Sequence, residues 1–179
     1  MTEKYFFDTD CLSAFLWARE ESILARLYPG RIILPMQVYN EIQRVPHLQA
    51  RVDVLKDQGD LSVESMETGS AEYLDYLQMT SSPEGGMRII GRGEAAGIAM
   101  AKHRDGTLAS NNLRDVRLYV EKYEIAHITT GDILIEAMNA GIITEADGNT
   151  IWAEMIKKRR MLPTATFSEY LIVYGKSDV

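Results

Sequence analysis

Three carboxylates occur where the surrounding residues are apolar, and together they suggest metal chemistry. Asp8 directly follows the apolar run of residues 5–7, while Glu41 and Glu94 each share the apolar stripe of a predicted helix. Burying an unpaired carboxylate costs several kcal/mol, and three that converge would repel one another strongly. A hard divalent cation, Mg²⁺ or Mn²⁺, resolves that repulsion because it prefers oxygen ligands.

Each of these carboxylates also has an ordinary structural interpretation. Asp8 can cap the helix that follows it, and Glu94 can lie in the first turn of its helix, where the dipole favours negative charge. Glu41 can pair with Arg44 or Arg51. The joint pattern favours a metal site, because the three carboxylates belong to three separate elements.

Predicted strands and helices alternate along the chain. Apolar runs predict strands at residues 5–7, 31–34, 61–64, 107–110 and 125–128. Helical spacing predicts helices at residues 12–17, 20–27, 36–44, 47–58, 71–79, 91–102, 113–122, 133–140, 144–161 and 167–173. This alternation predicts an α/β fold, a three-layer α/β/α sandwich with a central parallel sheet. Asp8 would stand at the carboxyl edge of that sheet, where such folds bind ligands.

Composition limits the class of protein. The chain has 179 residues, of which 46% are hydrophobic, which suits one domain with a proper core. A formal charge of -7 argues against coating nucleic acid by bulk positive charge, although a metal in an acidic site remains compatible with a nuclease. Cys11 is the only cysteine, which predicts a reducing cytoplasm. We expect neither a secretion signal nor a membrane span.

Five segments, taken in order, resemble the PIN domain, the metal-dependent ribonuclease fold of VapC-like toxins and many other prokaryotic nucleases. The segments are FFDTDCLSAFLW, LPMQVYNEIQR, GRGEAAGIAMAK, LASNNLRDVRLY and ITTGDILIEAMNAGII. They extend over about residues 4–143. We therefore predict a PIN-like domain at residues 1–143 and a C-terminal helical extension, residues 144–179, packed on the same domain.

The resemblance implies that Asp8, Glu41 and Glu94 bind the metal. The family usually places a fourth acidic residue just after the strand predicted at residues 107–110, and this chain has Asn111-Asn112 there instead. Asp115 follows one helical turn later. We hypothesise that the carbonyl oxygen of Asn112 and the carboxylate of Asp115, acting through a bridging water, complete the site.

The same residues leave alternatives open. Asp115 can instead pair with Arg92, Arg114 or Arg117, since exposed ion pairs are common. Asp132, which follows the predicted strand at residues 125–128, can be a further acidic group at the end of that strand, but we predict first that it caps a helix.

The basic run at residues 157–160 has two interpretations. Lys157 and Arg160 are candidates for contact with RNA phosphates, although a helix C-terminus favours basic residues in any case.

The function implied is a Mg²⁺/Mn²⁺-dependent endoribonuclease that hydrolyses RNA phosphodiester bonds, as the toxin of a toxin–antitoxin pair. RNA, an antitoxin protein and a second copy of the chain are the implied partners. The Asn111-Asn112 departure supports an alternative, a catalytically weakened PIN-like module that binds nucleic acid or protein. A second alternative is an unrelated α/β phosphohydrolase.

Overall fold

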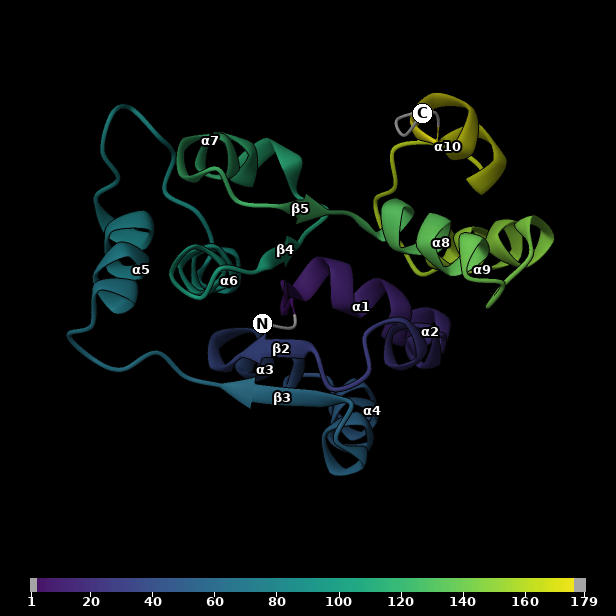
Figure 1. The fold of residues 1–179 in the computed structure, drawn as a ribbon, viewed down its shortest axis with the longest axis horizontal. Helices are drawn as coiled ribbons and strands as arrows, with labels where there is room; N and C mark the ends of the chain where they lie inside the picture. Colours follow the sequence, from purple (N-terminus) through teal and green to yellow (C-terminus); the bar gives the residue numbers. More distant parts are fainter. Residues whose placement is uncertain (1–2, 176–179) are drawn as a thin grey trace.

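The computed structural model describes residues 3–175, in which strands and helices alternate (Figure 1). The strands are β1 (Tyr5–Phe7), β2 (Ile32–Pro35), β3 (Leu61–Glu64), β4 (Thr107–Ala109) and β5 (His127–Ile128). The helices are α1 (Thr9–Ala18), α2 (Glu21–Leu27), α3 (Met36–Ile42), α4 (Pro46–Gln58), α5 (Ala71–Ser81), α6 (Arg92–His103), α7 (Leu113–Tyr123), α8 (Thr130–Asn139), α9 (Glu145–Lys157) and α10 (Phe167–Tyr174). Within these described residues, no helix is long and apolar enough to cross a membrane.

The strands form one parallel sheet in the order β3-β2-β1-β4-β5. The chain builds outward from β1 to β3, then returns to the other side of β1 to add β4 and β5. The order therefore reverses between β1 and β4, and ligands of such sheets bind beyond the carboxyl ends of the strands at that point. Phe7 lies opposite Ala109, so Asp8 and Ser110 emerge side by side there.

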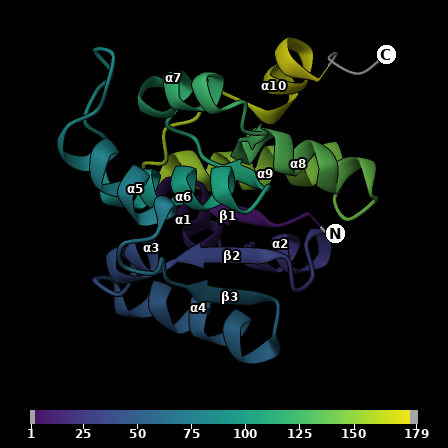
Figure 2. The same ribbon diagram turned by 60° about the vertical axis from the view of Figure 1, so that its left-hand side comes forward.

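Alternate side chains of β1 enter two separate cores. Tyr5 and Phe7 pack with the helices α1, α2, α4, α8, α9 and α10, whereas Phe6 packs with α5, α6 and α7. Figure 1 shows α5, α6 and α7 on the left of the central strands and α8, α9 and α10 on the right. Figure 2 shows α4 running along the β3 edge of the sheet. The predicted α/β/α sandwich is confirmed.

The last two helices share the core of β1. Trp152 of α9 is fully buried and packs against Phe167 and Tyr170 of α10 with tilted rings, at centroid distances of 5.9 and 5.2 Å. Its indole Nε1 donates a hydrogen bond to the carbonyl oxygen of Thr164 at 3.0 Å. The division of the chain after residue 143 stays a prediction.

Several predicted helix boundaries are wrong; α1 and α8, for example, begin at Thr9 and Thr130 rather than at residues 12 and 133. α9 ends at Lys157 rather than at residue 161, and Arg159 adopts the left-handed backbone conformation, with φ of 60°. The basic run therefore leaves the helix and turns back. Pro46 is the first residue of α4, because a proline at this position loses no helical hydrogen bond.

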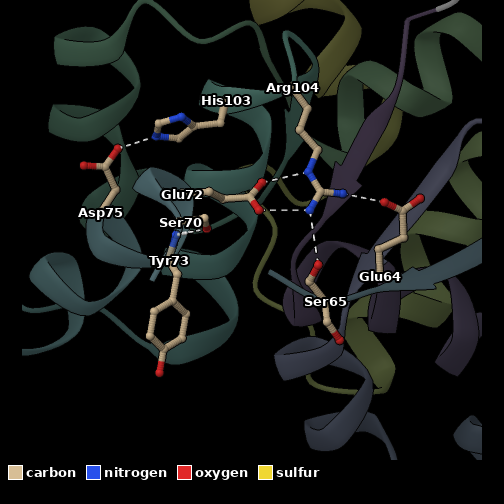
Figure 3. A network of polar contacts seen from close by, with 8 residues as sticks. All are labelled: Glu64, Ser65, Ser70, Glu72, Tyr73, Asp75, His103 and Arg104. Atoms are coloured by element: carbon tan, nitrogen blue, oxygen red, sulfur yellow. Dashed lines mark hydrogen bonds and ion pairs between the residues drawn. The ribbon is translucent and has the colours of Figure 1, made fainter. Parts of the chain in front are cut away.

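A group of ion pairs, here called the Arg104 clamp, joins α5 to β3 and to the end of α6 (Figure 3). The Arg104 guanidinium donates from Nε and Nη2 to the two carboxylate oxygens of Glu72, at 2.7 and 3.0 Å. It also pairs with Glu64 and donates to the carbonyl oxygen of Ser65 at 3.3 Å. Such two-pronged contacts are among the strongest ion pairs in proteins.

Candidate metal centre

Asp8, Glu41 and Glu94 line one small cavity at the point where the strand order reverses. This acidic pocket has a volume of about 150 Å³, and its lining also includes Thr9, Asp10 and Gly93. The residues come from the β1–α1 turn, from α3 and from the start of α6. The structure thus places the three carboxylates at one cavity, and their role as metal ligands stays a prediction.

Asp8 is buried, with an exposed fraction of 1%. Its Oδ1 accepts a hydrogen bond from the Cys11 N–H at 2.7 Å and caps α1, while its Oδ2 accepts no hydrogen bond from any of residues 3–175. Burial raises the pKa of Asp8 to about 7, and the negative charges of Asp10 and Glu94 add to that shift. The nearby Ser110 hydroxyl, although it forms no well-aligned hydrogen bond with Oδ2, and the Cys11 N–H oppose part of that rise. The capping interpretation is therefore confirmed for Oδ1. Among residues 3–175, no positively charged side chain pairs with Oδ2.

Glu94 likewise divides its two oxygens between two partners. Its Oε2 accepts from the Gly91 N–H at 2.7 Å, so the interpretation as a first-turn helix residue is correct. Its Oε1 accepts from the Asn112 side-chain Nδ2 at 2.6 Å. This carboxylate therefore links the start of α6 to the segment after β4, on the rim of the acidic pocket.

Glu41 is held in place by a neighbour on the β1–α1 turn. The Thr9 hydroxyl donates a hydrogen bond to Glu41 Oε2. A Cβ at Gly93 would lie 3.2 Å from Thr9 Oγ1 and 3.3 Å from Glu41 Oε2, so the glycine keeps this part of the pocket open. Arg51, one of the partners considered for Glu41, pairs instead with Glu21.

Both polar atoms of the Asn111 side chain contact Thr130. Its Oδ1 accepts from the Thr130 N–H at 2.9 Å, and its Nδ2 donates to Thr130 Oγ1 at 2.8 Å. The side chain therefore ties the end of β4 to the start of α8. The predicted capping role of Asp132 in α8 is confirmed, because Thr129 and Asp132 form a reciprocal cap there.

Asn112 presents its amide nitrogen to the carboxylates. Its Nδ2 donates to Glu94 Oε1 and also to Asp115 Oδ2, the latter at 2.9 Å. Asp115 additionally lies 3.4 Å from an Arg88 guanidinium nitrogen, so its basic partner is none of the three arginines considered. Asn112 and Asp115 line a neighbouring cavity, and their role as metal ligands stays a prediction.

That neighbouring cavity, here called the arginine pocket, has a volume of about 560 Å³ and carries both charges. Its charged lining consists of Asp10, Arg114, Asp115, Arg159 and Arg160. Arg160 Nη1 donates to the Ser13 hydroxyl of α1 at 3.3 Å, which holds the basic turn against the site.

Of the two candidates for RNA contact, only Arg160 lines this pocket. Lys157 pairs with Glu154 at 3.3 Å. The sequence analysis did not single out Arg159 within the basic run, and it considered Arg114 only as a partner of Asp115. The basic run was the available signal for Arg159, but the backbone reversal that directs it was not visible in the sequence.

The donors at the acidic pocket fit a hard divalent cation. Within residues 3–175, no group of three or more Asp, Glu, His or Cys side chains is already arranged as a formed metal site. Hydrogen bonds from Thr9, Gly91 and Asn112 occupy oxygens of Glu41 and Glu94. The unpartnered, buried Asp8 Oδ2 nevertheless requires a proton or a cation, and an all-oxygen donor set suits Mg²⁺ or Mn²⁺.

Comparison with known proteins identifies the family. A family model described as a PIN domain matches residues 4–176. The match includes the acidic pocket and continues through α9 and α10, beyond the segments on which the resemblance rested. The curated proteins contain no match to this chain. Because the family model covers nearly the whole sequence, this chain belongs to the PIN domain family.

Proposed function

We propose that this protein is a Mg²⁺/Mn²⁺-dependent endoribonuclease whose acidic pocket holds the cation. PIN domains are generally nucleases and typically use a divalent metal. The observation that carries the proposal is the buried Asp8 Oδ2, which lacks a hydrogen-bond partner in a cavity shared with Glu41 and Glu94. Family membership removes the alternative of an unrelated phosphohydrolase.

The chain's own residues would hold the cation in a set orientation. When bound, a divalent ion supplies an activated water and stabilises the charge that develops on the phosphate. Asp8 would offer Oδ2, because the Cys11 N–H fixes its other oxygen. The Thr9 hydroxyl and the Gly91 N–H similarly restrain Glu41 and Glu94. The start of α6 adds the positive end of a helix dipole beside these carboxylates.

The direct test is cleavage of a pool of structured RNAs by the full chain in Mg²⁺, Mn²⁺ or EDTA. We expect cleavage with either metal and none with EDTA. Asp8→Asn should be inactive, whereas Asp57→Asn, a change to an exposed carboxylate on α4, should retain full activity. Cleavage that persists in EDTA or in Asp8→Asn would refute the proposal.

A second candidate is a PIN-like module that binds nucleic acid or protein with little cleavage. The amide of Asn112 favours it, because this neutral group lies between Glu94 and Asp115 where the family resemblance leads us to expect another acid. This candidate gains if the natural chain binds RNA but does not cut it in Mn²⁺, while Asn112→Asp gains activity.

The proposal extends to a toxin that acts in the reducing cytoplasm, where the buried, unpaired Cys11 would remain a thiol. Expression of the chain should then arrest growth, and expression of Asp8→Asn should not. Co-expression of a small protein encoded by the neighbouring reading frame should relieve the arrest if that protein is the antitoxin. Size measurement in solution tests the proposed homodimer.

A further inference from the structure

A third cavity, here called the aromatic pocket, lies beyond the arginine pocket. It has a volume of about 430 Å³, within the range of pockets that bind small molecules. Its lining includes His127, Leu162, Pro163, Tyr170 and Tyr174. None of these residues is used by the metal chemistry proposed above.

Hydrogen bonds and burial hold Tyr170 of this pocket in place. Tyr170 is buried, and its hydroxyl donates to Asp132 Oδ1 at 2.9 Å and lies 3.0 Å from Thr129 Oγ1. Its ring covers Gly131 so closely that a Cβ there would lie 2.2 Å from Tyr170 Cζ. The Tyr174 ring lies 4.6 Å from that of Tyr170 at an interplanar angle of 31°, and Tyr174 is 46% exposed. Of these two packed rings, the outer one, that of Tyr174, is therefore accessible to solvent.

The arginine pocket shares lining residues with the acidic pocket on one side and with the aromatic pocket on the other. Asp10 borders both the acidic pocket and the arginine pocket. Asn111, Leu113 and Met161 border both the arginine pocket and the aromatic pocket. Leu113 and Met161 are exposed apolar side chains at the shared wall. A flexible polymer that begins at the carboxylates can thus continue past the arginines to the tyrosines.

The charges along this path match a nucleic acid strand. The arginine pocket contains Arg114, Arg159 and Arg160 against Asp10 and Asp115. Arginine is well suited to phosphate because its guanidinium fork matches two oxygens at once. In the aromatic pocket, hydrogen bonds from Thr129 and Tyr170 already occupy the oxygens of Asp132, so an uncharged flat group fits there.

We propose, on the basis of the ribonuclease function above, that the aromatic pocket is a subsite for one unpaired base of the RNA substrate, which stacks on Tyr174. A phosphate that flanks the scissile one lies in the arginine pocket, and the base of the next nucleotide enters the aromatic pocket. Duplex RNA is excluded because its bases are already paired and stacked, whereas unpaired bases stack readily on aromatic side chains.

The test measures binding of a short fluorescent RNA strand to the full chain in EDTA at low salt, where the proposed metal chemistry cannot occur. Base–aromatic stacking contributes about 1–3 kcal/mol, so Tyr174→Ala should weaken binding about 5- to 150-fold. Tyr174→Phe keeps the ring and should bind like the wild type. Ile172→Ala, an exposed change on the same helix, is the matched control. The same strand annealed to its complement should bind weakly and ignore Tyr174→Ala.

Salt dependence tests the arginine pocket separately. Arg159→Ala should reduce the slope of log affinity against log salt by about 0.7, the value for one phosphate contact to a single strand. Lys56→Ala, which removes a charge paired with Asp53 on α4, should leave the slope unchanged.

Failure of this inference is distinguishable from failure of the ribonuclease proposal. Equal binding by Tyr174→Ala and Ile172→Ala, or binding of duplex as tight as of single strand, overturns the inference even if the chain cuts RNA in Mn²⁺. Strong dependence of binding on Tyr174 supports it even if no cleavage occurs with any metal.

Discussion

Two groups of carboxylates from distant elements meet in this protein, and only one of them contains its own cation. In the Arg104 clamp, Glu64 and Glu72 share a guanidinium that contacts both (Figure 3). At the acidic pocket, Asp8, Glu41 and Glu94 come together without a comparable partner. No Lys, Arg or His between residues 3 and 175 forms an ion pair with any of these three.

The difference separates a structural group of charges from a candidate functional one. Both carboxylates of the clamp contact the same guanidinium, so the clamp can hold α5 in place without any ligand. The acidic pocket retains an unpartnered buried oxygen and a carboxyl whose pKa burial raises to about 7. Such a site depends on a proton or a cation from solution.

The largest expected effect is a difference in cleavage activity between two variants, each of which removes one carboxylate charge, one from the acidic pocket and one from the Arg104 clamp. Glu41→Gln should lower Mg²⁺-dependent cleavage about 100-fold or more, because the metal loses a carboxylate. The stability of the Glu41→Gln protein should change little, because Gln can still accept the hydrogen bond from Thr9. Glu64→Gln should leave cleavage intact and lower the melting temperature. Equal loss of cleavage in both variants would abolish the distinction.

The second effect is on the pH dependence of stability without metal. The pKa of Asp8 is about 7 in the folded protein against 3.8 as the ordinary value, so the folded state binds more protons between these limits. The free energy of unfolding should therefore fall as pH rises from about 4 to about 7, by on the order of 3 kcal/mol. Urea unfolding in EDTA should show this fall in Asp57→Asn but not in Asp8→Asn. Parallel curves for the two variants would contradict it.

The third effect concerns the clamp itself. Arg104→Leu leaves Glu72 without its guanidinium in a largely buried position, and we expect a loss of about 2 kcal/mol in the free energy of unfolding. Because the clamp takes no cation from solution, saturating Mg²⁺ should not restore this loss specifically. The melting temperature should shift with Mg²⁺ by the same amount in Arg104→Leu and in the wild type.

The smallest effect is expected at Asn112. Asn112→Asp replaces an amide that donates to Glu94 and Asp115 with a third negative charge. Mn²⁺ affinity should rise about tenfold, while the metal-free protein should melt at a lower temperature because of the added repulsion. An unchanged Mn²⁺ affinity would show that this position lies outside the reach of the metal.

Features that depend on short stretches of the chain could be predicted from the sequence. The run at residues 5–7 is apolar on both faces because β1 is central, and Asp8 follows it directly. The inward positions of Glu41 and Glu94 follow from helical spacing. The structural and functional interpretations were not exclusive, because a carboxylate has two oxygens. In Asp8 one oxygen caps a helix and the other does not.

Features that depend on contacts between distant residues could not be predicted in the same way. Arg88 meets Asp115 across 27 positions, and Tyr170 meets Asp132 across 38. The basic run at residues 157–160 fits a helix end by charge alone, yet Arg159 turns the chain away in a left-handed conformation. Nothing in the local spacing of these residues marks the arginine pocket or the aromatic pocket.

The central claim is that the acidic pocket takes its cation from solution, and calorimetric titration of the metal-free chain with Mn²⁺ near pH 7 tests it most directly. The account predicts saturable binding by the wild type and by Arg104→Leu, with release of protons as Asp8 ionises. It predicts loss of that binding in Asp8→Asn. Equal binding by Asp8→Asn and the wild type, or no binding by the wild type, would contradict it.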